Sequence, residues 1–211
     1  MNKGYHYSVE DFRRVFNNRK ASIQGTKGEF AVVVPVVDID GEAHILYELR
    51  SDHIDRQPGE VCFPGGEIEK GETPLHAALR ETWEETGIRE PDIEIIAPLD
   101  IYHPPTGIVL YPFLAEIKQD ALKRMHLSEC EVAECFTVPA AFFENPPYEY
   151  KHYPEYNLGD DFDFNRIGLK DGNYNWRPLE HRIISWEYDG KFIWGMTALI
   201  TEWTIKILKQ N

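Results

Sequence analysis

The sequence predicts an α/β fold, and the order of its strand and helix signals permits a mixed β-sheet between helices. Runs rich in β-branched and aromatic residues recur along the chain with turn residues between them, which is typical of strands. Helical patterns stand before, between and after these runs, so both element types are expected in one fold. The 211 residues, 42% of them hydrophobic, suffice for one well-buried domain. We therefore expect residues 1–211 to form a single domain.

Strand signals and turn signals alternate along most of the chain. The predicted strands are residues 30–37, 43–49, 60–63, 93–99, 109–117, 132–138, 183–188 and 191–194. Turns are expected at Asp38–Gly41, His103–Gly107 and Asp189–Gly190, and a brief helical turn over residues 139–143. The segment 145–176 is rich in Pro, Tyr, Asp and Asn without periodicity, so we expect an irregular insertion whose tyrosines offer stacking surfaces for an adenine ring.

Helices are predicted near both ends of the chain. Ser8 is a suitable N-cap for a short helix over residues 8–18, whose apolar side carries Phe12, Val15 and Phe16. Near the carboxyl end, apolar residues recur at spacings of 3, 4 and 7, which is typical of the packing face of an amphipathic helix. That predicted face consists of Met196, Leu199, Ile200, Trp203 and Ile207.

A further helix is predicted over residues 74–86. Thr73 is a good N-cap, and Pro74 follows at the first helical position, where its missing N–H costs nothing. Gly87 supplies the left-handed residue that commonly ends a helix.

Three carboxylates crowd one face of this helix, because Glu81, Glu84 and Glu85 are related as i, i+3 and i+4. Like charges at that spacing destabilise an exposed helix by a few tenths of a kcal/mol per pair. The pattern therefore favours a cationic partner, and hard divalent ions prefer such oxygen ligands. Taken alone, it would also fit a solvated acidic face.

The surrounding stretch decides between these two interpretations. GEIEKGETPLHAALRETWEETGI, from Gly66 to Ile88, resembles the signature box of the Nudix hydrolases. The matching positions are Gly66, Glu72, Arg80, Glu81, Glu84, Glu85 and Gly87. The resemblance implies a Nudix-type α/β/α sandwich with a mixed β-sheet. It also implies a diphosphohydrolase that uses Mg²⁺ or Mn²⁺.

The resemblance assigns metal ligands to this helix and to the turn before it. Glu81 and Glu85 match the main ligands of the family, and Glu84 matches an auxiliary one. A backbone carbonyl of the Phe-Pro-Gly-Gly turn is also a ligand in the family, so we expect it from Gly65 or Gly66. Glycines there let the backbone come close to a ligand.

Glu72 and Arg80 match positions that pair by charge and orient the ligands. Arg80 is also placed to form an ordinary i, i+4 pair with Glu84, worth a few tenths of a kcal/mol, and both interpretations are compatible.

A second stretch resembles the coenzyme A pyrophosphatase subgroup of Nudix proteins. In LRSDHIDRQPGEVCFPGG, Arg50-Ser51 and Gly59 fall in register, while Asp55 stands at the expected second arginine and Arg56 follows one residue later. Arg50 and Arg56 are the candidates for binding substrate phosphate, because guanidinium binds phosphate through two donors. Arg50 could also serve as an edge-strand charge. Residues 192–198, FIWGMTA, resemble the segment that closes many members of the subgroup.

The resemblance implies attack of water on one phosphorus of a diphosphate. For coenzyme A or an acyl-coenzyme A, the products would be 3′,5′-ADP and (acyl-)4′-phosphopantetheine. The alternatives are a Nudix pyrophosphatase acting on ADP-ribose, NADH or a dinucleotide polyphosphate, and a non-catalytic Nudix-fold nucleotide sensor. The candidates for the general base are Glu84, Glu131 and Glu134, the last two with solvated edge-strand charge as their alternative role.

Composition limits the partners. The net charge of −14 disfavours DNA and RNA, so we expect a small nucleotide-derived substrate and no nucleic acid. The longest apolar run, residues 30–37, is too short for a membrane span, and the amino end lacks the apolar core of a signal peptide. The three cysteines contain no Cys-x-x-Cys pair and suit a reducing cytoplasm. A homodimer is left open.

Overall fold

The fold was analysed in a computed structural model that describes residues 6–155, 157–159, 161–169, 174–177 and 179–210. Its helices are α1 (Val9–Phe16), α2 (Pro74–Thr86), α3 (Gln119–Leu122) and α4 (Gly195–Leu208), with 3₁₀ turns η1 (Glu90–Asp92), η2 (Ala140–Glu144) and η3 (Phe164–Ile167). Its strands are β1 (Gly28–Ile39), β2 (Glu42–Arg50), β3 (Val61–Cys62), β4 (Gly65–Glu67), β5 (Ile93–Pro98), β6 (Ile108–Ile117), β7 (Val132–Pro139), β8 (Tyr148–His152), β9 (His181–Tyr188) and β10 (Lys191–Trp194).

The larger sheet is mixed and has seven strands. Its path runs β3-β2-β1-β6-β5, with β4 paired to β1 and β7 paired to β2. The β1–β6 pairing is parallel, and the other pairings of this sheet are antiparallel. A smaller antiparallel sheet of three strands has the order β10-β9-β8.

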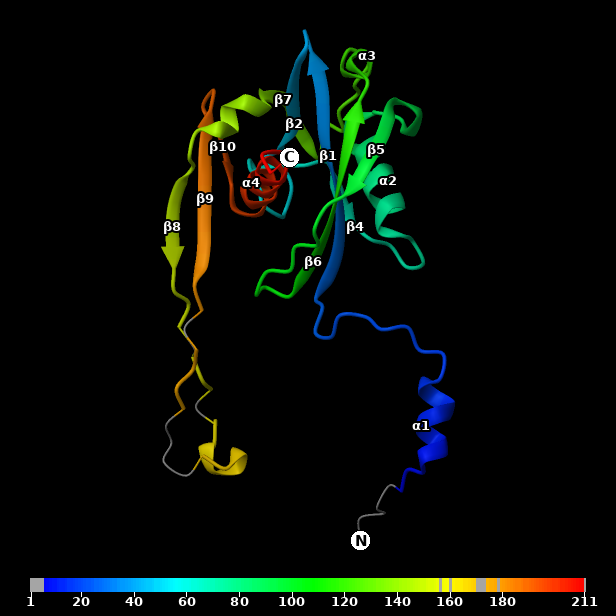
Figure 1. Cartoon of the computed structure of the whole chain (residues 1–211), viewed down its shortest axis with the longest axis vertical. Coiled ribbons are helices and arrows are strands. Elements are labelled where there is room, and N and C mark those ends of the chain that lie inside the picture. Colours follow the sequence, from blue (N-terminus) through cyan, green and yellow to red (C-terminus); the bar gives the residue numbers. More distant parts are fainter. Residues whose placement is uncertain (1–5, 156, 160, 170–173, 178, 211) are drawn as a thin grey trace.

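Helices cover both faces of the larger sheet, with α2 on one side and α4 on the other (Figure 1). The side chains of β1 alternate between these layers, as the two-residue period of a strand requires. Ala31 and Val33 pack with Ala77 and Ala78 of α2. On the opposite face, the core joins the sheet to α4 and to the smaller sheet through Val32, Val34, Tyr47, Ile184, Trp186, Ile193, Ala198, Ile200 and Ile205. The predicted α/β fold with a mixed sheet between helices is confirmed.

Local signals placed several elements well. α2 spans the predicted residues 74–86, the Thr73 hydroxyl accepts a hydrogen bond from the His76 amide at 3.2 Å, and Gly87 ends the helix with φ +72°. The β1–β2 turn has positive φ at both Asp40 and Gly41, the arrangement of a type I′ hairpin turn. Such signals act over a few residues, so they can be recognised without the rest of the fold.

The insertion predicted over residues 145–176 is not irregular throughout. Residues 148–152 form β8, which pairs with β9. All five residues of β8 are exposed, so backbone pairing with a strand far along the chain, rather than burial of an apolar face, holds β8 in place. Residues 156, 160 and 170–173 of this segment lie outside the described residues.

The packing face predicted for the last helix is also wrong in part. Ile200 is buried, but Trp203 is 43% exposed and its indole N–H donates to Asp100 Oδ2 at 2.5 Å. The other residues that α4 buries are Ala198, Thr201 and Ile205. Two of these buried residues, Ala198 and Thr201, are small, so a pattern of large apolar residues does not include them.

The first helix is present as α1, capped by Ser8, and buries none of its residues. Phe12, Val15 and Phe16, its predicted apolar side, are all more than half exposed. Over the described parts of the chain, every helix is too short or too polar to cross a membrane.

Candidate active site

A cleft of about 530 Å³ lies between the larger sheet, α2 and the first turns of α4. The loop after β2, the glycine turn at β4 and the loop before β7 complete its walls. Its charged lining residues are Arg50, Arg56, Glu67, Glu81, Glu85 and Glu131. Predicted site residues from distant segments of the sequence therefore meet in one place.

The glycine turn brings the backbone against the two carboxylates. A Cβ on Gly66 would overlap with the carboxylate of Glu81. Gly65 has φ +148°, and a Cβ there would overlap with the carbonyl oxygen of Ala31 in β1. The Gly65 amide donates to Glu85 Oε2 at 2.8 Å. A side chain at position 65 would overlap with β1 and one at position 66 with Glu81, so both positions require glycine.

Arg80 is the centre of a charged network at the edge of the cleft. Its guanidinium binds both oxygens of Glu72, each at 3.0 Å, and donates to the carbonyl of Glu67 at 3.2 Å. A third nitrogen donates to Glu81 Oε1 at 2.7 Å. The two-pronged bond to Arg80 lowers the pKa of Glu72 to about 2. Glu72 does not line the cleft, but it holds the arginine that contacts Glu81.

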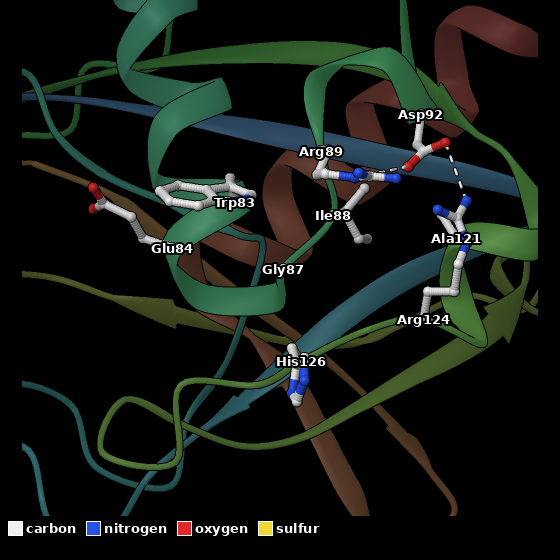
Figure 2. A pocket seen from close by; sticks show the side chains of 9 residues that line it. All are labelled: Trp83, Glu84, Gly87, Ile88, Arg89, Asp92, Ala121, Arg124 and His126. Atoms are coloured by element: carbon white, nitrogen blue, oxygen red, sulfur yellow. Dashed lines mark hydrogen bonds and ion pairs between the residues drawn. The ribbon is translucent and has the colours of Figure 1, made fainter.

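Glu84 shares Arg80 Nη1 with Glu81 but is more exposed than the other two carboxylates of α2. Its Oε2 lies 3.1 Å from Arg80 Nη1, so the predicted i, i+4 pair is present. Its side chain is 45% exposed and borders a different hollow, next to Trp83 (Figure 2). Adjacent residues are about 100° apart around a helix. The sheet packs against the Glu85 side, so Glu84 is the most exposed of the three carboxylates.

Burial makes the cleft carboxylates costly to ionise. Desolvation raises the pKa of Glu85, which is 6% exposed, and the nearby charge of Glu81 raises it further. Desolvation also raises the pKa of Glu81, although the Arg80 bond acts in the opposite direction. These two groups would gain most from a cation placed between them and the solvent.

Glu48 is a functional candidate that the sequence analysis missed. It lies on β2 and is 1% exposed, and its Oε1 has no hydrogen-bond partner within the described ranges. Desolvation and the charge of Glu85 raise its pKa well above the usual range. The available signal was a single carboxylate inside the apolar run Ile45-Leu46-Tyr47-Glu48-Leu49. That run gave no sign of which groups would surround it.

Arg50 and Arg56 both reach the cleft. The loop between them turns back so that Arg50 Nε donates to the carbonyl of Arg56 at 3.3 Å, and Gly59, with φ +68°, closes the turn. The charge of Arg50 lowers the pKa values of Glu48 and Glu85, against the effect of burial. Two arginines thus stand beside the carboxylates, where an anionic substrate would need them.

The two later candidates for the general base are separated by the fold. Glu131 lines the cleft, and its carbonyl accepts the Ser51 amide at 2.8 Å. Glu134 lies on β7 and pairs with Lys191 of β10 at 3.3 Å. Of these two, only Glu131 borders the space where a substrate would lie.

The carboxyl-terminal motif closes the cleft on the side of α4. Met196 and Thr197 line it, and the Thr197 hydroxyl donates to the carbonyl of Val61 in β3 at 3.1 Å. By contrast, Tyr148, Tyr150 and Tyr153 are exposed and are absent from the cleft lining, which does not support their predicted role as stacking surfaces.

The chain is similar in sequence to known proteins. The family model described as the NUDIX domain matches residues 29–156 of the chain. The peroxisomal coenzyme A diphosphatase NUDT7 of Mus musculus is 33% identical over 135 residues, which cover 60% of this chain and 53% of that protein. The mitochondrial coenzyme A diphosphatase NUDT8 of Homo sapiens is 28% identical over 198 residues, covering 93% of this chain and 76% of that protein.

The chain spans about half the length of some relatives that it matches. Among solved structures, a MutT/nudix family protein from Enterococcus faecalis aligns over 96% of this chain and 70% of its own, with a TM-score of 0.50 and 13% identity. That likeness concerns the fold.

Proposed function

This chain belongs to the Nudix hydrolase family, and from that premise we propose that it hydrolyses the diphosphate bond of coenzyme A or an acyl-coenzyme A. One observation carries the proposal. Two desolvated carboxylates, Glu81 and Glu85, share a cleft with Arg50, Arg56 and the motif at the start of α4. Similarity to the two coenzyme A diphosphatases supports the choice of substrate.

Nudix hydrolases generally use divalent metal ions, and the donor set here fits Mg²⁺ or Mn²⁺. No group of three or more His, Cys, Asp or Glu side chains gathers into a ready cage among the described residues. Mg²⁺ in phosphate chemistry commonly relies on one or two carboxylates, with water and substrate oxygens as its other ligands. Glu81, Glu85 and a carbonyl of Gly65 or Gly66 match that demand, with Glu84 as auxiliary ligand. When bound, the ion would offset the negative charge of the diphosphate.

The protein groups then have distinct roles. Arg50 and Arg56 bind the phosphate oxygens, because guanidinium suits their geometry. Glu72 orients Arg80, which in turn orients Glu81. Glu131 is the favoured general base, since it lines the cleft, and it would take a proton from the attacking water.

In the reaction, the oxygen of water forms a bond to one phosphorus and the bond from that phosphorus to the bridging oxygen breaks. The water protons pass to the base and to the products, which are 3′,5′-ADP and (acyl-)4′-phosphopantetheine. No redox partner is needed.

The domain organisation of one unit over 1–211 is likewise proposed. One apolar core joins the larger sheet to α4 and to the smaller sheet, which supports a single domain for the part beyond α1. A cytoplasmic location is proposed from the three cysteines, which are free thiols in the structure.

The test is product analysis by mass spectrometry with Mg²⁺ or Mn²⁺. The substrates are coenzyme A, an acyl-coenzyme A, ADP-ribose, NADH and a diadenosine polyphosphate. Glu85→Gln serves as the site variant and Glu94→Gln, on the exposed side of β5, as the matched control.

Cleavage of coenzyme A that is lost in Glu85→Gln and kept in Glu94→Gln would support the proposal. Preference for ADP-ribose, NADH or a dinucleotide would retain the hydrolase and discard the coenzyme A assignment. Absence of metal-dependent turnover with every substrate would favour a non-catalytic nucleotide sensor.

A further inference from the structure

A second hollow, of about 640 Å³, lies beyond the carboxyl-terminal end of α2 (Figure 2). It shares no lining residue with the candidate active site. Trp83 of α2 borders it on one side in Figure 2, with Arg89 and Arg124 opposite and His126 below. The volume falls within the usual range for sites that hold small molecules.

The arginines around this hollow have more hydrogen-bond donors than the nearby carboxylate engages. Asp92 lies between two arginines, with Arg124 Nη2 at 3.1 Å and Arg89 Nε at 3.9 Å. The hydrogen bond from Arg124 lowers the pKa of Asp92, so this carboxylate is ionised and already paired. The Arg89 side chain forms no hydrogen bond within the described ranges, and it is 64% exposed. Its Nε is ion-paired with Asp92, which leaves the two terminal nitrogens of the guanidinium available to an anion.

Glu84, the other acid at this hollow, does not neutralise Arg89. It is bound to Arg80 on its own helix. The imidazole of His126 has no hydrogen-bond partner among the described residues and adds further donor capacity. The chain as a whole is acidic, with a net charge of −14, so a concave surface that offers arginine donors differs from its general character.

The end of α2 does not repel an anion strongly. A helix carboxyl terminus bears partial negative charge on its last carbonyls. Here the carbonyl of Glu85 accepts the Ser128 amide at 2.9 Å, and that of Thr86 accepts the His126 amide at 2.8 Å. The loop that carries His126 therefore covers two of those carbonyls.

Trp83 provides an aromatic surface for a flat ring. It is 55% exposed, whereas the residues that α2 buries are Ala77, Ala78, Thr82, Glu85 and Thr86. The indole thus contributes little to the core of the fold. Exposed aromatic faces stack on nucleobases, since every base has a flat π-face.

We propose that this hollow binds a nucleoside monophosphate, with the base on Trp83 and the phosphate on Arg89 and Arg124. The site is separate from the diphosphate cleft. The proposal does not depend on catalysis, because Trp83, Arg89 and Arg124 take no part in the proposed reaction, although Glu84, the proposed auxiliary metal ligand, also lines this hollow.

The test is isothermal titration of the full chain with AMP, without added divalent metal. Trp83→Leu removes the stacking surface and Arg89→Gln removes the more exposed of the two arginines. Arg50→Gln tests the diphosphate cleft, and Arg13→Gln, an exposed arginine of α1, is the matched control for loss of one charge. Adenosine and ribose 5-phosphate separate the base from the phosphate. Circular dichroism verifies that each variant is folded.

We expect Trp83→Leu and Arg89→Gln each to weaken AMP binding about tenfold or more, whereas Arg50→Gln and Arg13→Gln leave it unchanged. Adenosine and ribose 5-phosphate should each bind more weakly than AMP. Binding that is lost in Arg50→Gln but kept in Trp83→Leu and Arg89→Gln would place AMP in the cleft and overturn the proposal. Absence of AMP binding in the millimolar range would also overturn it.

Discussion

The two sides of α2 carry charged residues in contrasting surroundings. On the cleft side, Glu81 and Glu85 are withdrawn from solvent and held by Arg80 and by the Gly65 amide. On the far side Trp83 is exposed, and Arg89, just beyond the end of α2, is exposed and paired only loosely with Asp92, at 3.9 Å. Electrostatic effects strengthen where water is excluded and weaken where it screens. Substitutions on the cleft side should therefore change chemistry strongly, and those on the far side should not.

The sharpest test of this comparison is Glu85→Gln. Removal of a buried carboxylate that we propose as a metal ligand should lower kcat/KM roughly a thousandfold, because metal ions supply several kcal/mol of transition-state stabilisation. The affinity for Mn²⁺, measured by electron paramagnetic resonance, should fall as well. The control Glu94→Gln should match the unchanged protein. Unaltered Mn²⁺ binding in Glu85→Gln would contradict the ligand assignment.

Gly66→Ala tests whether the close approach of Glu81 matters. The added Cβ would overlap with the Glu81 carboxylate and displace it. A displacement of about 1 Å at a catalytic group can reduce the rate roughly a hundredfold. Gly71→Ala is the comparison, because φ is +89° there but nothing lies within 4 Å of an added Cβ. It should lower the melting temperature while leaving Mn²⁺ affinity intact. Equal Mn²⁺ affinity in both variants would show that the turn does not position Glu81.

Glu72→Gln examines a group that acts through Arg80. Loss of its two-pronged bond should reduce metal affinity or kcat roughly 10–100-fold, as observed for partners of metal ligands. The pKa of Glu72 is lowered to about 2, so the stability that its pair contributes is present above the ordinary glutamate pKa and is lost as the pH falls toward 2. Acid unfolding of Glu72→Gln should show less of this dependence. Activity and acid unfolding that both equal those of the unchanged protein would contradict this role.

Glu48→Gln should reveal the cost of burying a carboxylate beside Glu85. The folded-state pKa of Glu48 is raised, so the folded protein holds its proton while the unfolded chain releases it, and stability declines as the pH rises above the ordinary glutamate pKa. The variant lacks this decline. In metal-free denaturant unfolding, the free energy of unfolding of the variant relative to that of the unchanged protein should increase as the pH rises above the ordinary glutamate pKa. A difference that stays constant with pH would show that Glu48 has an ordinary pKa.

Trp83→Leu should have the smallest effect on the reaction. The indole lies on the far side of α2 and is absent from the cleft lining. We expect metal-dependent kcat/KM within about twofold of the unchanged protein, a change below about 0.5 kcal/mol. A larger loss would show that the two sides of the helix are coupled, and would contradict the expectation that substitutions on the far side leave the chemistry unchanged.

Elements defined by neighbouring residues were accessible from the sequence. Thr73, Pro74 and Gly87 delimit α2 through caps that act within one turn, and Asp40-Gly41 forms its hairpin turn by its own backbone preference. The box pattern likewise placed Glu81 and Glu85 on one helix.

The sequence by itself thus determined the fold class, the bounds of α2 and the family. Tertiary structure alone decided that Glu84 is the most exposed of the three carboxylates on α2, that Glu131 rather than Glu134 borders the cleft, and that Glu48 is buried beside Glu85. These outcomes depend on which strands and helices pack together across long sequence separations. Local propensity and periodicity carry no information about such contacts, and desolvation arises only from them.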